Sequence, residues 1–168
     1  MDRVEAIASR AFLGSEFLTW LWFRIEAGEG TFALEKGSLD LFVDEKMTLE
    51  SLVGNATTAT LSGTMPSDSI EASTGLRDGK TLTSAAFRLK RAEREWKFGL
   101  KGRTLDLAIF HLPAILTKAE DDRFYERMAL LDELVYLLDQ LYGMFLGLRL
   151  NDGWDRELSD MRAWAAET

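Results

Sequence analysis

The sequence predicts an α+β domain, with an N-terminal helix, an antiparallel sheet of about six or seven strands, and a long C-terminal helix followed by a short returning helix. Three observations predict this class. Apolar residues recur at helical spacing near the start, alternate with polar residues in the middle, and recur every three or four positions near the end. The 168 residues contain no internal repeat and no Gly-, Ser- or Pro-rich linker, so we expect a single domain over residues 1–168.

The N-terminal helix is predicted to begin at Ser15, because a serine hydroxyl suits the N-cap position. Gly14 before it indicates a sharp entry turn, and Gly28 and Gly30 mark the end of the helix. Its apolar stripe consists of Phe17, Leu18, Leu21, Trp22 and Ile25.

The middle of the chain, residues 31–112, is predicted to form the sheet. Four short strands are expected at 31–35, 39–45, 47–53 and 56–65, then a short helix or loop at 68–80, and three clearer strands near 87–90, 96–101 and 105–109. Period-two alternation with one apolar face indicates an antiparallel sheet that is covered on one side. Pro113 ends the last strand.

The long helix is predicted at 121–148 and carries two apolar rows at four-three spacing. The first row is Phe124, Met128, Leu131, Val135, Leu138, Tyr142 and Phe145. The second row is Leu130, Leu134, Leu137, Leu141, Met144 and Leu148. Two adjacent rows are wider than one packing surface requires, so one contacts the sheet and the other contacts a final helix near 155–166 or another copy of the chain. The second row is the candidate interface, and the alternative is that both rows are core.

Composition excludes several classes of site. The chain has no cysteine and a single histidine, His111, so it lacks disulfides, thiolate metal sites, cysteine nucleophiles and two-histidine metal sites. No phosphate-binding or dinucleotide-binding glycine motif is present, and we predict no cofactor and no metal. No apolar run reaches the roughly 18 to 20 residues that span a bilayer, and the acidic N-terminus is no secretory signal. We therefore expect no membrane contact and a cytoplasmic protein, with association with the nucleoid as the second option.

Charge is unevenly distributed along the chain. The net charge is −8, but residues 77–103 hold nine basic and three acidic residues, a balance of +6 that leaves −14 for the rest. An exposed basic strand face suits sequence-independent contact with phosphates. The candidate DNA-binding residues are Arg88, Lys90, Arg91, Arg94, Lys97, Lys101 and Arg103. The alternative is a solvated strand face, or one paired with acidic residues of the same chain.

Glu16, Trp20 and His111 are three further residues of interest. Glu16 falls in the first turn of the predicted helix, where the helix dipole favours a carboxylate, so we interpret it as a capping residue. Trp20 lies off the apolar stripe and is the candidate for a surface aromatic that stacks on bases. His111 ends an apolar strand and is interpreted as a core or edge histidine, and we predict no catalytic residue.

The string FLGSEFLTWLW, residues 12–22, resembles the opening of the C-terminal half of long RdgC-like recombination-associated proteins. The resemblance continues through GLRDGK, the three strands after it, the leucine-rich helix and the closing NDGWDRELSDMRAWAAE. Its signature residues here are Phe12, Leu13, Gly14, Glu16, Phe17, Leu18, Trp20, Leu21 and Trp22. The resemblance implies a non-enzymatic role on duplex DNA, in ring-shaped dimers that limit RecA filaments.

The long relatives have an N-terminal portion that this sequence lacks, so we expect a homo-oligomer or a separate protein partner that replaces it. The leading hypothesis is a recombination-associated DNA-binding or DNA-complex subunit. The second is a protein-interaction or oligomerisation module without DNA contact. The third is a metal-dependent nuclease, since Glu95 and Lys97 match the E-x-K half of a metal-dependent nuclease signature and Asp78 lies upstream.

Overall fold

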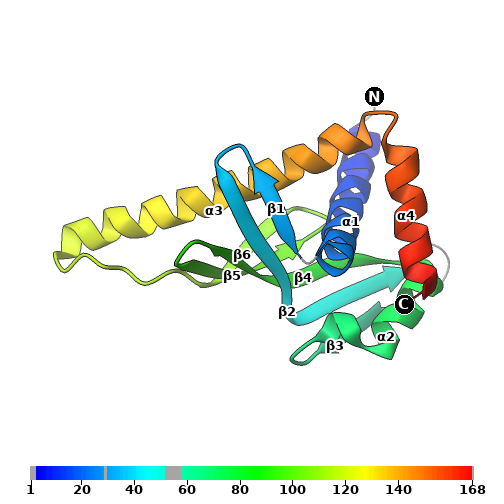
Figure 1. The fold of residues 1–168 in the computed structure, drawn as a ribbon, viewed down its shortest axis with the longest axis horizontal. Helices are drawn as coiled ribbons and strands as arrows, with labels where there is room; N and C mark the ends of the chain where they lie inside the picture. The colour runs from blue at the N-terminus through cyan, green and yellow to red at the C-terminus, as the bar shows by residue number, and fades with distance from the viewer. Residues whose placement is uncertain (1–2, 29, 52–57, 168) are drawn as a thin grey trace.

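The computed structural model describes residues 3–28, 30–51 and 58–167, with side chains described from residue 13 onward. The elements in chain order are α1 (Arg3–Ala27), β1 (Thr31–Leu34), β2 (Gly37–Ser51), β3 (Thr58–Ser62), the 3-10 helix η1 (Pro66–Asp68), α2 (Ile70–Arg77), β4 (Lys80–Arg91), β5 (Arg94–Lys101), β6 (Asp106–His111), α3 (Glu120–Arg149) and α4 (Trp154–Glu167) (Figure 1). The predicted α+β class is confirmed.

The sheet has six strands in the order β1-β2-β4-β5-β6, with β3 also paired to β2, and every pairing is antiparallel. The strands predicted at 39–45 and 47–53 are one long strand, β2. Its first half pairs with β1 and its second half with β3, and an irregularity between Val43 and Met47 separates the two halves. Parts of two predicted strands, 52–53 and 56–57, lie outside the described residues. A bulge in one strand thus lets two short strands share the same edge.

The helices pack against one face of the sheet, which we call the inner face. Leu82, Phe87 and Leu89 of β4 and Trp96, Phe98 and Leu100 of β5 point to that face and are buried. The Trp96 indole donates a hydrogen bond of 3.1 Å to the Leu130 carbonyl oxygen of α3. At the C-terminal half of β2, α2 approaches the strand so closely that a Cβ on Gly75 would lie 3.0 Å from the Leu49 side chain. The opposite, outer face bears the polar side chains of β4 and β5.

Helix α1 starts well before the predicted N-cap. It is helical from Arg3, so Ser15 lies in the middle of the helix, and the predicted N-cap and entry turn are wrong. Gly14 has a different role: a Cβ there would lie 1.7 Å from the Gly102 carbonyl oxygen, so only glycine allows α1 to pass the turn after β5. The predicted end of the helix is confirmed, since the Gly28 N–H donates to the Arg24 carbonyl at 3.0 Å.

Helix α3 matches its predicted range but presents the opposite row to the core. Leu130, Leu134, Leu137 and Leu141 are buried against the sheet and α1 and form the core row. The candidate interface is therefore wrong for these four leucines, and Met144 and Leu148 also pack against the core. Phe145 closes the core among Phe17, Trp20 and Trp154. The predicted final helix is confirmed as α4, which packs on α1 through Trp164 and Trp22, with ring centroids 5.2 Å apart.

Candidate functional site

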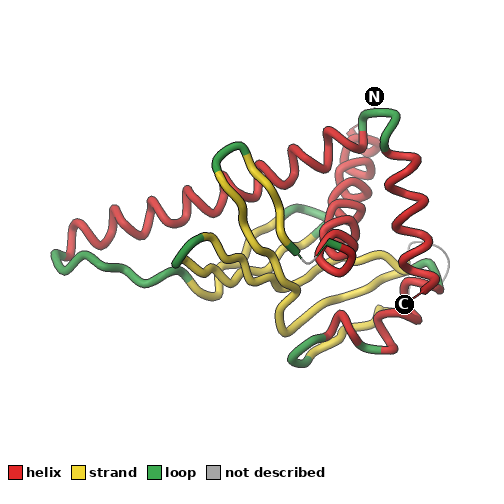
Figure 2. Tube along the Cα trace, in the orientation of Figure 1, coloured by secondary structure: helices red, strands yellow, loops and turns green. Residues whose placement is uncertain are grey.

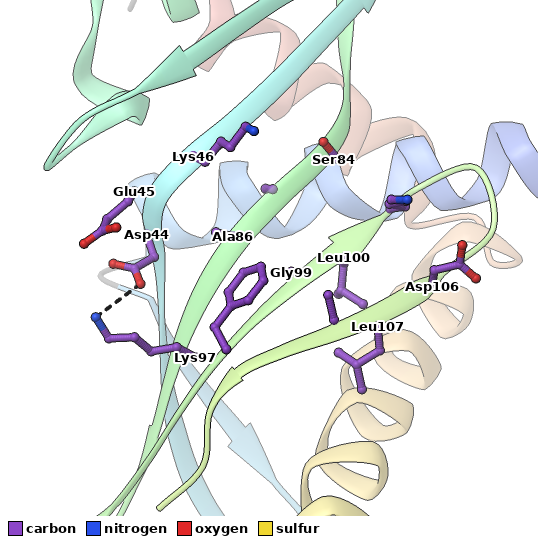
Figure 3. Close-up of a pocket in the computed structure, with 14 residues that line it drawn as sticks. Asp44, Glu45, Lys46, Ser84, Ala86, Lys97, Gly99, Leu100, Asp106 and Leu107 are labelled. Carbon is purple, nitrogen blue, oxygen red and sulfur yellow. Dashed lines mark ion pairs between the residues drawn. The ribbon is translucent and has the colours of Figure 1, made fainter.

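The outer face of the sheet contains a hollow of about 520 Å³ (Figure 3). Small residues form its floor, namely Ser84, Ala86, Gly99 and Ala108. The Phe110 ring lies over Gly99, where a Cβ would come within 3.0 Å of it, and Phe110 is 64% exposed. Three acidic and three basic side chains surround the floor: Asp44, Glu45, Asp106, Lys46, Lys97 and Lys101. The hollow is thus electrically balanced rather than basic.

Two of the candidate DNA-binding lysines are paired with carboxylates on this face. Lys97 Nζ of β5 lies 3.5 Å from the Asp44 carboxylate of β2 and forms an ion pair with it. Lys90 Nζ of β4 lies 3.3 Å from the carboxylate of Glu95, the residue opposite it on β5. Such pairs stabilise the fold only modestly, but each cancels a positive charge that a phosphate would need.

Two of the candidate arginines form ion pairs with α3. Arg91 lies 3.2 Å from Glu133, and Arg94 pairs with the same carboxylate. Arg91 also donates a hydrogen bond of 2.8 Å to the Lys36 carbonyl. These contacts hold the β4–β5 hairpin against α3, which is a structural role.

The remaining candidates are Arg88, Lys101 and Arg103. The Arg88 guanidinium stacks over the Phe42 ring at 5.1 Å and is half-buried. Lys101 and Arg103 are exposed, and within the described part of the chain neither forms an ion pair. The basic stretch is therefore largely compensated by the chain's own acidic residues.

The family-signature residues belong to the core. Phe17, Leu18, Leu21 and Trp22 are buried, Leu13 packs against them, and the Phe12 side chain lies outside the described residues. Trp20 is wrong as a surface aromatic: it is 0% exposed, and its indole donates to Glu157 at 2.8 Å. The stripe argument failed because α3, α4 and the sheet surround this part of α1.

Glu16 is also placed differently from the prediction. It lies in the middle of α1 and accepts a hydrogen bond of 2.9 Å from Arg149 Nε of α3, so it is not a capping residue. The pair joins the first and last parts of the chain.

The residues of the nuclease hypothesis are not assembled into a metal centre. Glu95 pairs with Lys90, Lys97 pairs with Asp44, and Asp78 caps the C-terminus of α2. In residues 3–28, 30–51 and 58–167, no three His, Asp or Glu side chains form a group that could hold a metal ion. His111 is exposed at the end of β6, which agrees with an edge position.

A second candidate site is the first predicted row of α3. The N-terminal half of this helix and the segment 112–119 extend beyond the sheet (Figure 2). Phe124 is 60% exposed, Met128 42% and Val135 48%, and Leu131, Leu138 and Tyr142 are half-buried. We call these six residues the outer row. Sequence patterning could not separate it from the core row because both have the same spacing and equally apolar residues.

The outer row continues into an apolar groove of about 210 Å³ between α3 and the β5–β6 hairpin. Its walls are Phe17, Leu100, Leu105, Leu107, Val135, Leu138 and Tyr142. Asp139 is the one charged side chain among the described residues that line it. The exposed helix face and the groove form one continuous surface.

The segment before α3 is fixed to the helix by Glu126. Its carboxylate accepts hydrogen bonds from the N–H groups of Leu116 and Thr117, each 2.9 Å long, and from the Thr117 hydroxyl. The Leu116 N–H above all, then the two Thr117 groups, hold the pKa of the Glu126 carboxyl below its usual value. These bonds connect the segment directly to the N-terminal part of α3.

Comparison with known proteins finds no matching family model and no curated protein of significant similarity. The RdgC-like resemblance therefore stays a prediction from the residues quoted above. Within the described residues, none of the helices is both long and apolar enough to cross a membrane.

Proposed function

We propose that this chain is a non-enzymatic subunit of a DNA-recombination complex, which it joins through protein contacts. The observation that carries the proposal is the exposed outer row of α3, an apolar face that continues into a groove. Contiguous exposed apolar surface with polar residues around it marks interaction sites in soluble proteins. The RdgC-like resemblance supports the choice of complex.

Direct DNA binding by this chain is the second candidate. Lys101 and Arg103, both exposed and without an ion pair among the described residues, favour it. Of the seven candidate cations, these two are exposed without an ion pair, four are ion-paired and Arg88 lies half-buried over Phe42. This count favours weak and non-specific duplex binding, because affinity for DNA grows with the number of phosphates neutralised.

Duplex affinity across a salt series separates the two candidates. We expect weak binding by fluorescence anisotropy at 150 mM salt, with a log–log salt slope of about −2 that the double variant Lys101→Glu, Arg103→Glu removes, since two of the candidate cations are free of ion pairs. Tight binding that this variant abolishes would favour direct DNA recognition over the proposal.

Affinity purification from the source cells tests the protein contact. The wild-type chain should retain recombination or repair proteins that Val135→Asp loses and that the matched control Ile70→Asp keeps. Ile70 is 81% exposed on α2, away from the outer row. Identical sets of captured proteins for all three chains would contradict the proposal.

A further inference from the structure

We infer that the outer row and its groove bind an amphipathic helix of a partner protein, one with Lys or Arg beside its apolar stripe. This inference rests on the proposed function, because it names the partner chemistry of the same surface. Three features of the surface support it: its spacing, the charge on its free side, and the acid in the groove.

The spacing of the outer row matches a second helix. Phe124, Met128, Leu131, Val135 and Leu138 follow a four-three repeat, the spacing with which one helix receives the side chains of another. Val135, Leu138 and Tyr142 also line the groove. A helix lying along the row would therefore continue into the groove without a break.

The two sides of the outer row differ in charge and in access. On one side lies the core row, which the sheet covers from Leu130 onward. Toward the N-terminus of α3, Arg123 and Arg127 occupy the positions that continue this row at the same spacing. The other side is free, and its charged residues are Asp122, Asp132 and Asp139. None of these three forms an ion pair with another described residue. The charged residues on the open side of the apolar stripe are therefore all acidic.

Asp139 places a carboxylate at the wall of an otherwise apolar groove. A Lys or Arg side chain can lay its aliphatic stem on Leu138 and Leu107 while its charged head reaches this carboxylate. An acidic or neutral partner would leave the carboxylate unpaired when it covers the groove, which costs binding energy.

A second copy of the chain fits this surface poorly. Two antiparallel α3 helices related by a two-fold axis contact each other through the same side, so Asp132 and Asp139 would face the acidic side of the other copy. Like charges at such a contact weaken binding. In a parallel pair of α3 helices, the acidic side of one copy would contact the core-row side of the other, and the core row is buried in each chain. Charge thus selects a basic partner over self-association.

Two synthetic peptides test the inference with the intact chain. Each has 28 residues with Leu at the apolar heptad positions and Ala elsewhere, and the flanking positions carry Lys in one and Glu in the other. We expect the Lys peptide to bind at least about tenfold more tightly at low salt, the sum of a few exposed ion pairs. The double variant Asp132→Lys, Asp139→Lys should reverse the preference.

Val135→Asp distinguishes docking from general attraction to an acidic protein. It adds a negative charge inside the outer row, so docking predicts weaker binding of the Lys peptide, by about tenfold or more. Ile70→Asp adds the same charge elsewhere and should leave the affinity unchanged. Equal or tighter binding by Val135→Asp would overturn the inference, since attraction to net charge would then explain the affinity.

The remaining outcomes separate this inference from the proposed function. A concentration-dependent dimer in sizing chromatography that Val135→Asp dissociates would assign the surface to a second copy and overturn the basic partner. If neither peptide binds while Val135→Asp still loses recombination proteins from cells, the inference fails and the proposed function stands. If Val135→Asp changes neither the peptide affinity nor the proteins captured from cells, both the inference and the proposed function fail.

Discussion

Helices α1 and α3 are both long and rich in apolar residues, yet they differ in what surrounds them. From Gly14 to Phe23, α1 is enclosed by the sheet, α3 and α4, and even Trp20, off the predicted stripe, is buried. Helix α3 buries one row and leaves the other exposed over its N-terminal half (Figure 1). The same kind of sequence therefore serves as a core in one place and as a surface in the other, and what decides is how many elements pack around the helix.

Lysine substitutions at two neighbouring positions of α3, one in each row, should give the largest difference in stability. Leu134→Lys puts an unpaired charge into the core and should unfold the chain, because the cost of several kcal/mol is a large part of a typical domain's stability. Val135→Lys, one residue along and on the exposed row, should change the free energy of unfolding by less than about 0.5 kcal/mol. Thermal melts followed by circular dichroism measure both. Equal stability of the two variants would contradict the burial difference between the rows, and a less stable Val135→Lys would show that the rows are assigned the wrong way round.

Glycine-to-alanine changes give the next largest contrast. At Gly14 the new methyl would meet the Gly102 carbonyl oxygen at 1.7 Å, so the backbone must move, at a cost of about 3 kcal/mol. Gly143 of α3 has nothing within 4 Å of a Cβ, so Gly143→Ala should stabilise by about 1 kcal/mol through helix propensity. Opposite signs in urea unfolding are expected, and a stabilising Gly14→Ala would mean that α1 does not approach the β5 turn so closely.

Aromatic residues on the two helices give a smaller contrast. Trp20→Phe removes the donor to Glu157, which Arg24 also approaches at 3.6 Å, and should cost about 2 kcal/mol, as for other hydrogen bonds to charged groups. Tyr125→Phe, on the exposed side of α3, should be neutral within about 0.5 kcal/mol. Urea unfolding at pH 7 compares them, and similar losses would place Tyr125 in a contact that the structure does not contain.

The smallest expected effect is local and depends on pH. Because the pKa of Glu126 is lower in the folded chain, its ionised form favours the ordered 112–119 segment above its unfolded pKa, and this contribution disappears as pH falls through the folded pKa. Glu126→Gln should therefore speed hydrogen exchange of the Leu116 and Thr117 amides several-fold at pH 7 and make little difference in acid, relative to wild type at each pH. The control Glu120→Gln should leave these amides unchanged at both pH values.

The sequence was sufficient for the sheet and for the positions of the main helices, because period-two and period-3.6 patterns report which face is covered. It was insufficient wherever a contact comes from elements far apart in the chain. The start of α1 was misplaced because Gly14 is explained by Gly102, 88 positions later, and not by a local turn. The core row of α3 was misassigned because Leu130 and Val135 look alike until the sheet is placed beneath one of them.

For the candidate site, alternation correctly put Lys90 and Lys97 opposite the apolar face, but charge counting did not reveal their partners. Lys90 pairs with Glu95 inside the basic stretch. Lys97 pairs with Asp44 of β2, and Arg91 and Arg94 pair with Glu133 of α3, so these two carboxylates lie outside the stretch. A local excess of positive charge in one stretch of an acidic protein is thus a weak predictor of an anion site, because the compensating carboxylates are found only when the strands are brought together.

The contacts that α1 makes with residues much later in the sequence have a consequence for synthesis of the chain. Thr19 accepts its tertiary hydrogen bond from the Leu82 N–H at 3.2 Å, Gly14 fits against Gly102, and Trp22 meets Trp164. Helix α1 is therefore synthesised well before the residues that surround it in the folded chain. Trp20, Trp22 and other large apolar side chains of α1 therefore stay uncovered during synthesis until α4 has emerged, and exposed apolar surface of this kind favours aggregation before folding is complete.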